Sequence, residues 1–104
     1  MNFKIEVSQK AFNLINEAVS FVNNVSHEAA LSLYKEIMES IRSLETMPRR
    51  CPVVKFLSSA AVEIRKMNVN DGRYSLLYSI KEDVVFINSF IDLRQKEHMD
   101  IFKP

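Results

Sequence analysis

The sequence has very few of the residues that build disulfides and metal centres. Its single cysteine, Cys51, cannot form an intramolecular disulfide or a cysteine zinc site, which fits a reducing compartment. Its two histidines, His27 and His98, lie far apart in the chain. We therefore expect no bound metal and no cofactor.

Long apolar runs are also missing. No stretch reaches the roughly 18 consecutive apolar residues that a membrane-spanning helix needs. Glu6 and Lys10 interrupt the N-terminal stretch where a secretion signal would need an uninterrupted apolar core. We therefore expect a cytoplasmic protein without a membrane segment. Its 104 residues, with 47% apolar content, fit one domain over residues 1–104.

Glycine occurs once and proline three times, so these few residues mark the turns clearly. Gly72 ends the sequence "NDG", which predicts a tight hairpin with a type I′ turn and a positive φ at Gly72. Pro48 and Pro52 predict an irregular loop over residues 48–61, with a short helical turn near 57–61. "KED" at 81–83 predicts a second tight turn.

The remaining residues show clear periodicities. Residues 3–7, "FKIEV", alternate like a half-buried strand. Ser8 and Ser26 are suited to cap two helices, the first ending at Asn23–Asn24 and the second stopped by Pro48. Strands are predicted over residues 62–69, 74–80 and 84–91.

This order predicts an α+β fold with an N-terminal strand, an antiparallel helical hairpin and a three-stranded antiparallel meander. The helices are expected on one face of a small sheet, and the opposite face is expected to lack a second layer. In the strand over 62–69 the apolar positions change from even to odd numbers, which predicts a bulge or a change of the exposed face near Arg65 and Lys66.

Charge is nearly balanced overall, at +1, but it is unevenly distributed. The balance is −2 over residues 1–48, +4 over 49–73 and −1 over 74–104. A basic middle segment is compatible with a phosphate-contacting face, but on charge alone it is more often an ordinary solvated loop and strand edge.

The chain resembles the RelE/ParE superfamily of toxins from bacterial type II toxin–antitoxin systems. The resemblance rests on the order of elements and on three stretches: "SLETMPRRCP", "RYSLLYSI" and "VVFINSFIDLRQ". It implies a growth-inhibiting toxin, neutralised by a cognate antitoxin protein that wraps it, of the kind linked to plasmid stabilization.

The resemblance leaves the cellular target open. ParE-like members poison DNA gyrase, whereas RelE-like members are metal-independent endonucleases that cleave mRNA in the ribosome. Ser75 follows Tyr74 where nuclease members often have an arginine, so we favour the ParE-like interpretation. The alternatives are an mRNA interferase and a degenerate, non-toxic binding partner.

Candidate site residues are few. Arg65, Lys66, Arg73 and Arg94 are predicted to contact the target, and if the chain is a nuclease, Lys66, Arg94 and His98 would carry catalysis. Lys66 and Arg94 match cationic positions of the nuclease members. His98 has the pKa suited to proton transfer, although a lone histidine near the end of a chain is more often a solvated surface residue. The competing interpretation of Arg94 is an ion pair with Asp92 or Glu97. We expect Arg94 to lie over the face of the sheet away from the helices.

Overall fold

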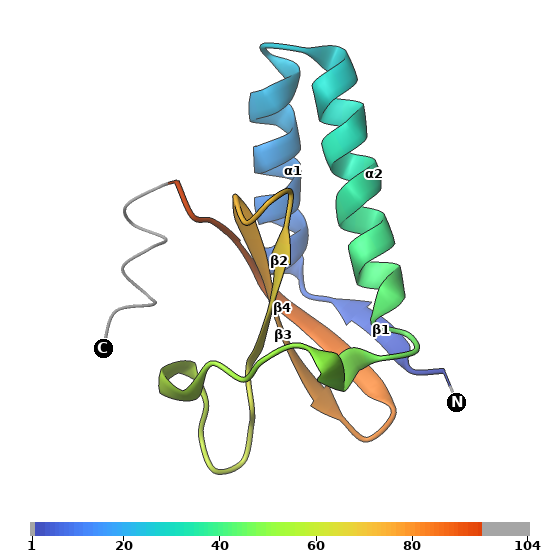
Figure 1. Cartoon of the computed structure of the whole chain (residues 1–104), viewed down its shortest axis with the longest axis vertical. Helices are drawn as coiled ribbons and strands as arrows, with labels where there is room; N and C mark the ends of the chain where they lie inside the picture. The colour runs from blue at the N-terminus through green and yellow to red at the C-terminus, as the bar shows by residue number, and fades with distance from the viewer. Residues whose placement is uncertain (1, 95–104) are drawn as a thin grey trace.

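The structure is a computed structural model that describes residues 2–94. Its elements run β1 (Lys4–Val7), α1 (Gln9–Asn23), α2 (His27–Ser43), β2 (Arg65–Val69), β3 (Tyr74–Lys81) and β4 (Val84–Asp92). Two short 3₁₀ turns, η1 (Pro48–Arg50) and η2 (Lys55–Leu57), lie in the connection between α2 and β2. The helical hairpin stands at one end of the sheet and extends beyond the β2–β3 turn (Figure 1). The predicted α+β fold is confirmed.

The helices begin where the sequence predicted. The Ser8 hydroxyl accepts a hydrogen bond from the Ala11 N–H at 3.0 Å, and the Ser26 hydroxyl accepts one from the Ala29 N–H at 3.1 Å. Each cap satisfies a backbone donor that the first helical turn leaves free. The predicted N-caps are therefore confirmed.

The sheet has four strands in the order β1-β4-β3-β2. β2, β3 and β4 form the predicted antiparallel meander. β1 pairs with β4 in parallel, with Ile5 opposite Val85. Local periodicity predicted β1 as a strand but carried no information about its partner, because that pairing joins residues some 80 positions apart.

Of the two alternatives predicted near Arg65 and Lys66, the bulge is wrong. β2 and β3 keep one continuous register from Arg65–Tyr78 to Val69–Tyr74. The change in the apolar pattern marks the start of β2, because Val62 and Ile64 belong to the preceding loop. The irregularity lies instead between β3 and β4, where Asn88 is an extra residue in β4.

The predicted turn at Gly72 is confirmed. Asp71 and Gly72 have φ angles of 54° and 82°, and the Arg73 N–H donates to the Asn70 carbonyl at 3.1 Å. Positive φ at both central positions is the signature of a type I′ turn. The short helical turn in the loop lies at Lys55–Leu57, slightly before its predicted place.

The helix-facing side of the sheet forms the core. Its buried residues pack with one face of each helix: Ala11, Ile15, Leu33, Ile37, Ile41, Leu44, Val69, Tyr74, Leu76, Tyr78, Val85, Ile87 and Phe90. Tyr74, Leu76 and Tyr78 alternate along β3 with Ser75 and Leu77, which therefore belong to the opposite face.

The opposite face is less open than expected. Ser75, Leu77, Ser89 and Ile91 in its middle are all buried. They lie on β3 and β4, the two central strands, which have neighbours on both sides. The loop before β2 also approaches this face, because Ala61 and Val62 line a hollow together with Ser79 and Phe86. The expectation of an uncovered face is wrong for its centre.

Candidate functional site

Each of the two candidate regions contains a buried tyrosine of β3. Tyr74 and Tyr78 are at most 1% exposed and lie on the helix-facing side. They are four positions apart in the strand, about 13 Å at the usual rise per residue. An arginine accompanies each one: Arg94 lies beside Tyr74, and Arg65 pairs across the strands with Tyr78.

Arg94 forms a compact cluster with Tyr74 and Asp92 at the end of β4. Its Nη2 donates to the Tyr74 hydroxyl oxygen at 2.9 Å, and its Nε donates to Asp92 Oδ1 at 3.2 Å. The guanidinium carbon lies 5.4 Å from the centre of the Tyr74 ring, a cation–π distance. The Arg94 side chain nevertheless remains 45% exposed. It is therefore held in place and open to an approaching partner.

This cluster borders a cleft of about 240 Å³ between α1 and the end of the sheet. The floor is aromatic, because the Tyr74 and Phe90 rings stack with centroids 5.1 Å apart. The cleft is lined by Leu14, Glu17, Ala18, Phe21, Tyr74, Phe90, Asp92 and Arg94. We call it the Arg94 cleft.

The protonation states of the cluster follow from its surroundings. Burial raises the pKa of the Tyr74 hydroxyl, and the neighbouring Arg94 and Arg73 only partly offset this effect. The hydrogen bond to Asp92 raises the pKa of Arg94. At neutral pH the tyrosine is therefore neutral and the arginine charged. This arrangement does not make Tyr74 a general base at neutral pH.

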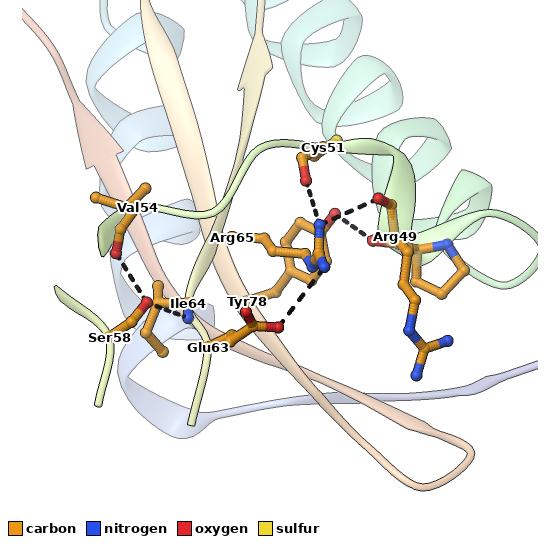
Figure 2. A network of polar contacts seen from close by, with 9 residues as sticks. Arg49, Cys51, Val54, Ser58, Glu63, Ile64, Arg65 and Tyr78 are labelled. Carbon is orange, nitrogen blue, oxygen red and sulfur yellow. Dashed lines mark hydrogen bonds and ion pairs between the residues drawn. The ribbon is translucent and has the colours of Figure 1, made fainter. Parts of the chain in front are cut away.

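Arg65 and Tyr78 form a second network at the other end of the strands (Figure 2). Arg65 Nη1 donates to the carbonyl oxygens of Cys51 at 2.6 Å and Arg49 at 3.1 Å. The Tyr78 hydroxyl donates to the Pro48 carbonyl oxygen at 2.6 Å. These bonds hold the loop after α2 against the sheet. The Arg65 guanidinium is therefore engaged by partners within the fold.

This second network has a structural role. Burial raises the pKa of the Tyr78 hydroxyl, and the adjacent Cys51 thiol raises it further. Glu63 is the remaining partner of Arg65, at 3.8 Å and largely exposed. A neutral tyrosine and an arginine bound to backbone carbonyls stabilise the loop without presenting a reactive group.

The structure divides the predicted cations between two places: Arg73 and Arg94 both neighbour Tyr74, whereas Arg65 and Lys66 lie at the start of β2. Lys66 lies opposite Leu77 and therefore belongs to the face away from the helices. Arg73 is exposed in the β2–β3 turn, and Arg94 is on the helix side, not over the opposite face as the sequence analysis expected. Arg65 lies at the far end of the strands from Arg94. His98 lies outside the described residues.

Sequence reasoning missed part of the Arg94 cleft. Phe21 is an apolar residue of α1, a type usually found in the core, but it is 68% exposed at the rim of the cleft. Glu17 carried no signal, since a charged residue on the outer side of a helix is usually solvated. Only the packing of α1 against β4 places these side chains beside Arg94.

Residues 2–94 contain no group of three or more histidine, cysteine, aspartate or glutamate side chains placed to hold a metal ion. None of the helices within that range is long and apolar enough to cross a membrane.

Comparison with known proteins gives a structural match. No protein-family model and no curated protein matches the sequence. A chain of the solved structure described as "Chromosomal ParDE TA system from P. aeruginosa" matches with a TM-score of 0.70 and 14% sequence identity. The match covers 86% of this chain and 95% of that chain. The chain therefore shares the fold of a chain from a ParDE system, which confirms at the level of the fold the RelE/ParE resemblance inferred from its sequence.

Proposed function

We propose that this protein is the toxin of a type II toxin–antitoxin pair, inhibiting growth when free and neutralised by a cognate antitoxin. The observation that carries the proposal is the structural match to a ParDE chain over 86% of the present chain. It agrees with the RelE/ParE resemblance of three separate sequence stretches.

Within this superfamily we propose the ParE-like activity, with DNA gyrase as the target. Cleavage of RNA needs a base for the 2′-hydroxyl and cations around the phosphate. In the described residues Arg65, Lys66 and Arg94 diverge, and Arg65 is bound to backbone carbonyls. This separation argues against a shared phosphate site.

Ser75 supports the same preference. It takes the place where nuclease members often have an arginine, and it is fully buried. Its hydroxyl donates to Asn68 Oδ1 at 2.9 Å. An arginine there would bury a charge in the middle of the sheet, which is costly without a partner. A single substitution of Ser75 by arginine would therefore not produce the nuclease arrangement in this chain.

The test is induced expression in a bacterium, followed by two assays on the same protein. We expect growth arrest, inhibition of supercoiling by purified gyrase, and no new mRNA ends in primer extension. New ends within codons, with gyrase unaffected, would instead establish the RelE-like endonuclease. Unimpaired growth and no effect in either assay would establish a non-toxic binding partner.

The antitoxin has its own test. Co-expression with the product of the adjacent gene should yield a stable complex and restore growth. Absence of a complex, with toxicity intact, would contradict the assignment of a neighbouring antitoxin. The two experiments separate the toxic activity from its neutralisation.

A further inference from the structure

The Arg94 cleft contains one carboxylate that the rest of the described chain leaves unpaired. Glu17 lines the α1 wall, and no side chain or backbone group among residues 2–94 forms an ion pair or hydrogen bond with it. Arg94 lines the same cleft but donates to Asp92 and Tyr74. Among residues 2–94, Glu17 is therefore the charged residue of the cleft lining that remains available to pair with an incoming cation.

The surroundings of Glu17 are apolar and aromatic. Phe21 follows Glu17 by four residues on α1, so the two side chains are neighbours on one helix face. Phe21 is 68% exposed, and Leu14, Ala18 and Phe90 line the same cleft. A group with an apolar stem and a cationic head matches this combination.

Among protein side chains, arginine matches best. Its planar guanidinium can stack on an aromatic ring and bind a carboxylate through two parallel hydrogen bonds, which a lysine ammonium cannot do. Its three methylenes can cover Leu14 and Phe90, two apolar residues of the cleft lining. A cleft of about 240 Å³ has room for one such side chain and little more.

We propose that the Arg94 cleft receives an arginine side chain of the antitoxin, with the guanidinium paired to Glu17 and stacked on Phe21. The identity of the partner rests on the proposed function. The preference for a guanidinium rests on Glu17, Phe21 and the already paired Arg94, and can be tested without the antitoxin.

The first experiment uses a small probe with the intact chain. N-acetyl-arginine methylamide is titrated against the ¹⁵N-labelled protein, beside N-acetyl-citrulline methylamide, which has a similar shape without the charge. We expect saturable shifts of the amides of residues 14–21 with the arginine probe. Binding of the citrulline probe should be weaker on the order of tenfold.

Matched variants locate the contact. Glu17→Gln should weaken arginine binding to the level of citrulline, whereas Glu39→Gln, an exposed glutamate on α2, should leave it unchanged. Phe21→Ala should weaken binding, whereas Phe12→Ala, another exposed phenylalanine of α1, should not. Thermal melting of each variant controls for folding. Equal binding of both probes, or unchanged binding by Glu17→Gln, would overturn the proposal.

The second experiment measures the complex with the antitoxin. Glu17→Gln should weaken it by a factor on the order of ten, and Glu39→Gln should not. A complex unaffected by Glu17→Gln would overturn the antitoxin as the source of the arginine. N-acetyl-aspartate methylamide binding at the cleft in place of the arginine probe would show that Arg94 selects an anion, and would also overturn the proposal. Failure of the proposed function would appear separately, as unimpaired growth on induction.

Discussion

The two ends of the β2–β3 pairing use the same pair of residue types in opposite ways. At one end Arg65 and Tyr78 donate to backbone carbonyl oxygens of the loop after α2, and the loop is closed over them. At the other end Arg94 donates to the Tyr74 hydroxyl oxygen and to Asp92, beside an open cleft. We call these the closed end and the open end. The comparison shows that partners in the fold, more than residue type, decide whether an arginine is structural or available to a partner.

The largest difference in stability should separate the two arginines. Arg65→Met removes the donor to two carbonyl oxygens at the closed end, so we expect a loss of about 1.5–3 kcal/mol in the free energy of unfolding. Arg94→Met breaks a half-exposed ion pair and should cost only about 0–1 kcal/mol. Urea unfolding of both variants measures the contrast. Equal losses would remove the distinction between the ends.

Removal of the tyrosine hydroxyl should likewise cost more stability at the closed end than at the open end. Tyr78→Phe leaves the Pro48 carbonyl oxygen without its buried donor, at a cost of about 1–3 kcal/mol. Tyr74→Phe removes only an acceptor from Arg94, which keeps Asp92, and should cost about 0.5–1 kcal/mol. Urea titration of the two variants at one pH checks the order, and a reversed order would contradict it.

The turn next to the open end should be sensitive to its backbone alone. Gly72 has φ +82°, and a Cβ added there would meet nothing within 4 Å. Gly72→Val should therefore destabilise the protein by about 1–2 kcal/mol through backbone strain without a steric clash.

The opposite sign is expected at the second hairpin, where Glu82 has φ 57°, and Glu82→Gly should stabilise the protein by a few tenths of a kcal/mol.

Alkaline pH should reduce the stability that the tyrosine at each end contributes to the folded protein. Tyr74 and Tyr78 have pKa values raised above their ordinary 10.0, so the unfolded chain releases these protons at a lower pH than the folded chain does. The stabilising contribution is fully present below pH 10 and is lost as the pH rises through the folded-state pKa values. Unfolding free energy should therefore fall above pH 10, and less steeply in Tyr78→Phe. A pH-independent stability up to pH 11 would contradict the raised pKa values.

Local features of the chain could be predicted from the sequence, because each depends on neighbouring residues. The Ser8 and Ser26 caps and the turn at Gly72 were all found at their predicted places. The wrong predictions concern contacts between distant segments. The bulge at Asn88 depends on how β3 and β4 align, and alternation within one strand cannot show that alignment.

The candidate site was less predictable for the same reason. Arg94 was singled out from the end of its strand, but its side of the sheet depends on the pairing of Asp92 with Tyr74. Glu17 and Phe21 join it only through the packing of α1 on β4. Strand geometry also separates residues that are adjacent in the sequence, since Arg65 and Lys66 fall on opposite faces of β2.

The most direct test of the account is growth inhibition by Arg94→Ala, measured on induction beside the parent and beside Arg42→Ala. Arg42 is an exposed arginine of α2 outside the Arg94 cleft, so its variant controls for the loss of one positive charge. We predict that Arg94→Ala loses inhibition while its unfolding free energy changes by less than about 1 kcal/mol, that Arg94→Lys restores little, and that Arg42→Ala stays toxic. Full toxicity of Arg94→Ala, or loss of toxicity only through unfolding, would contradict the functional role of the open end.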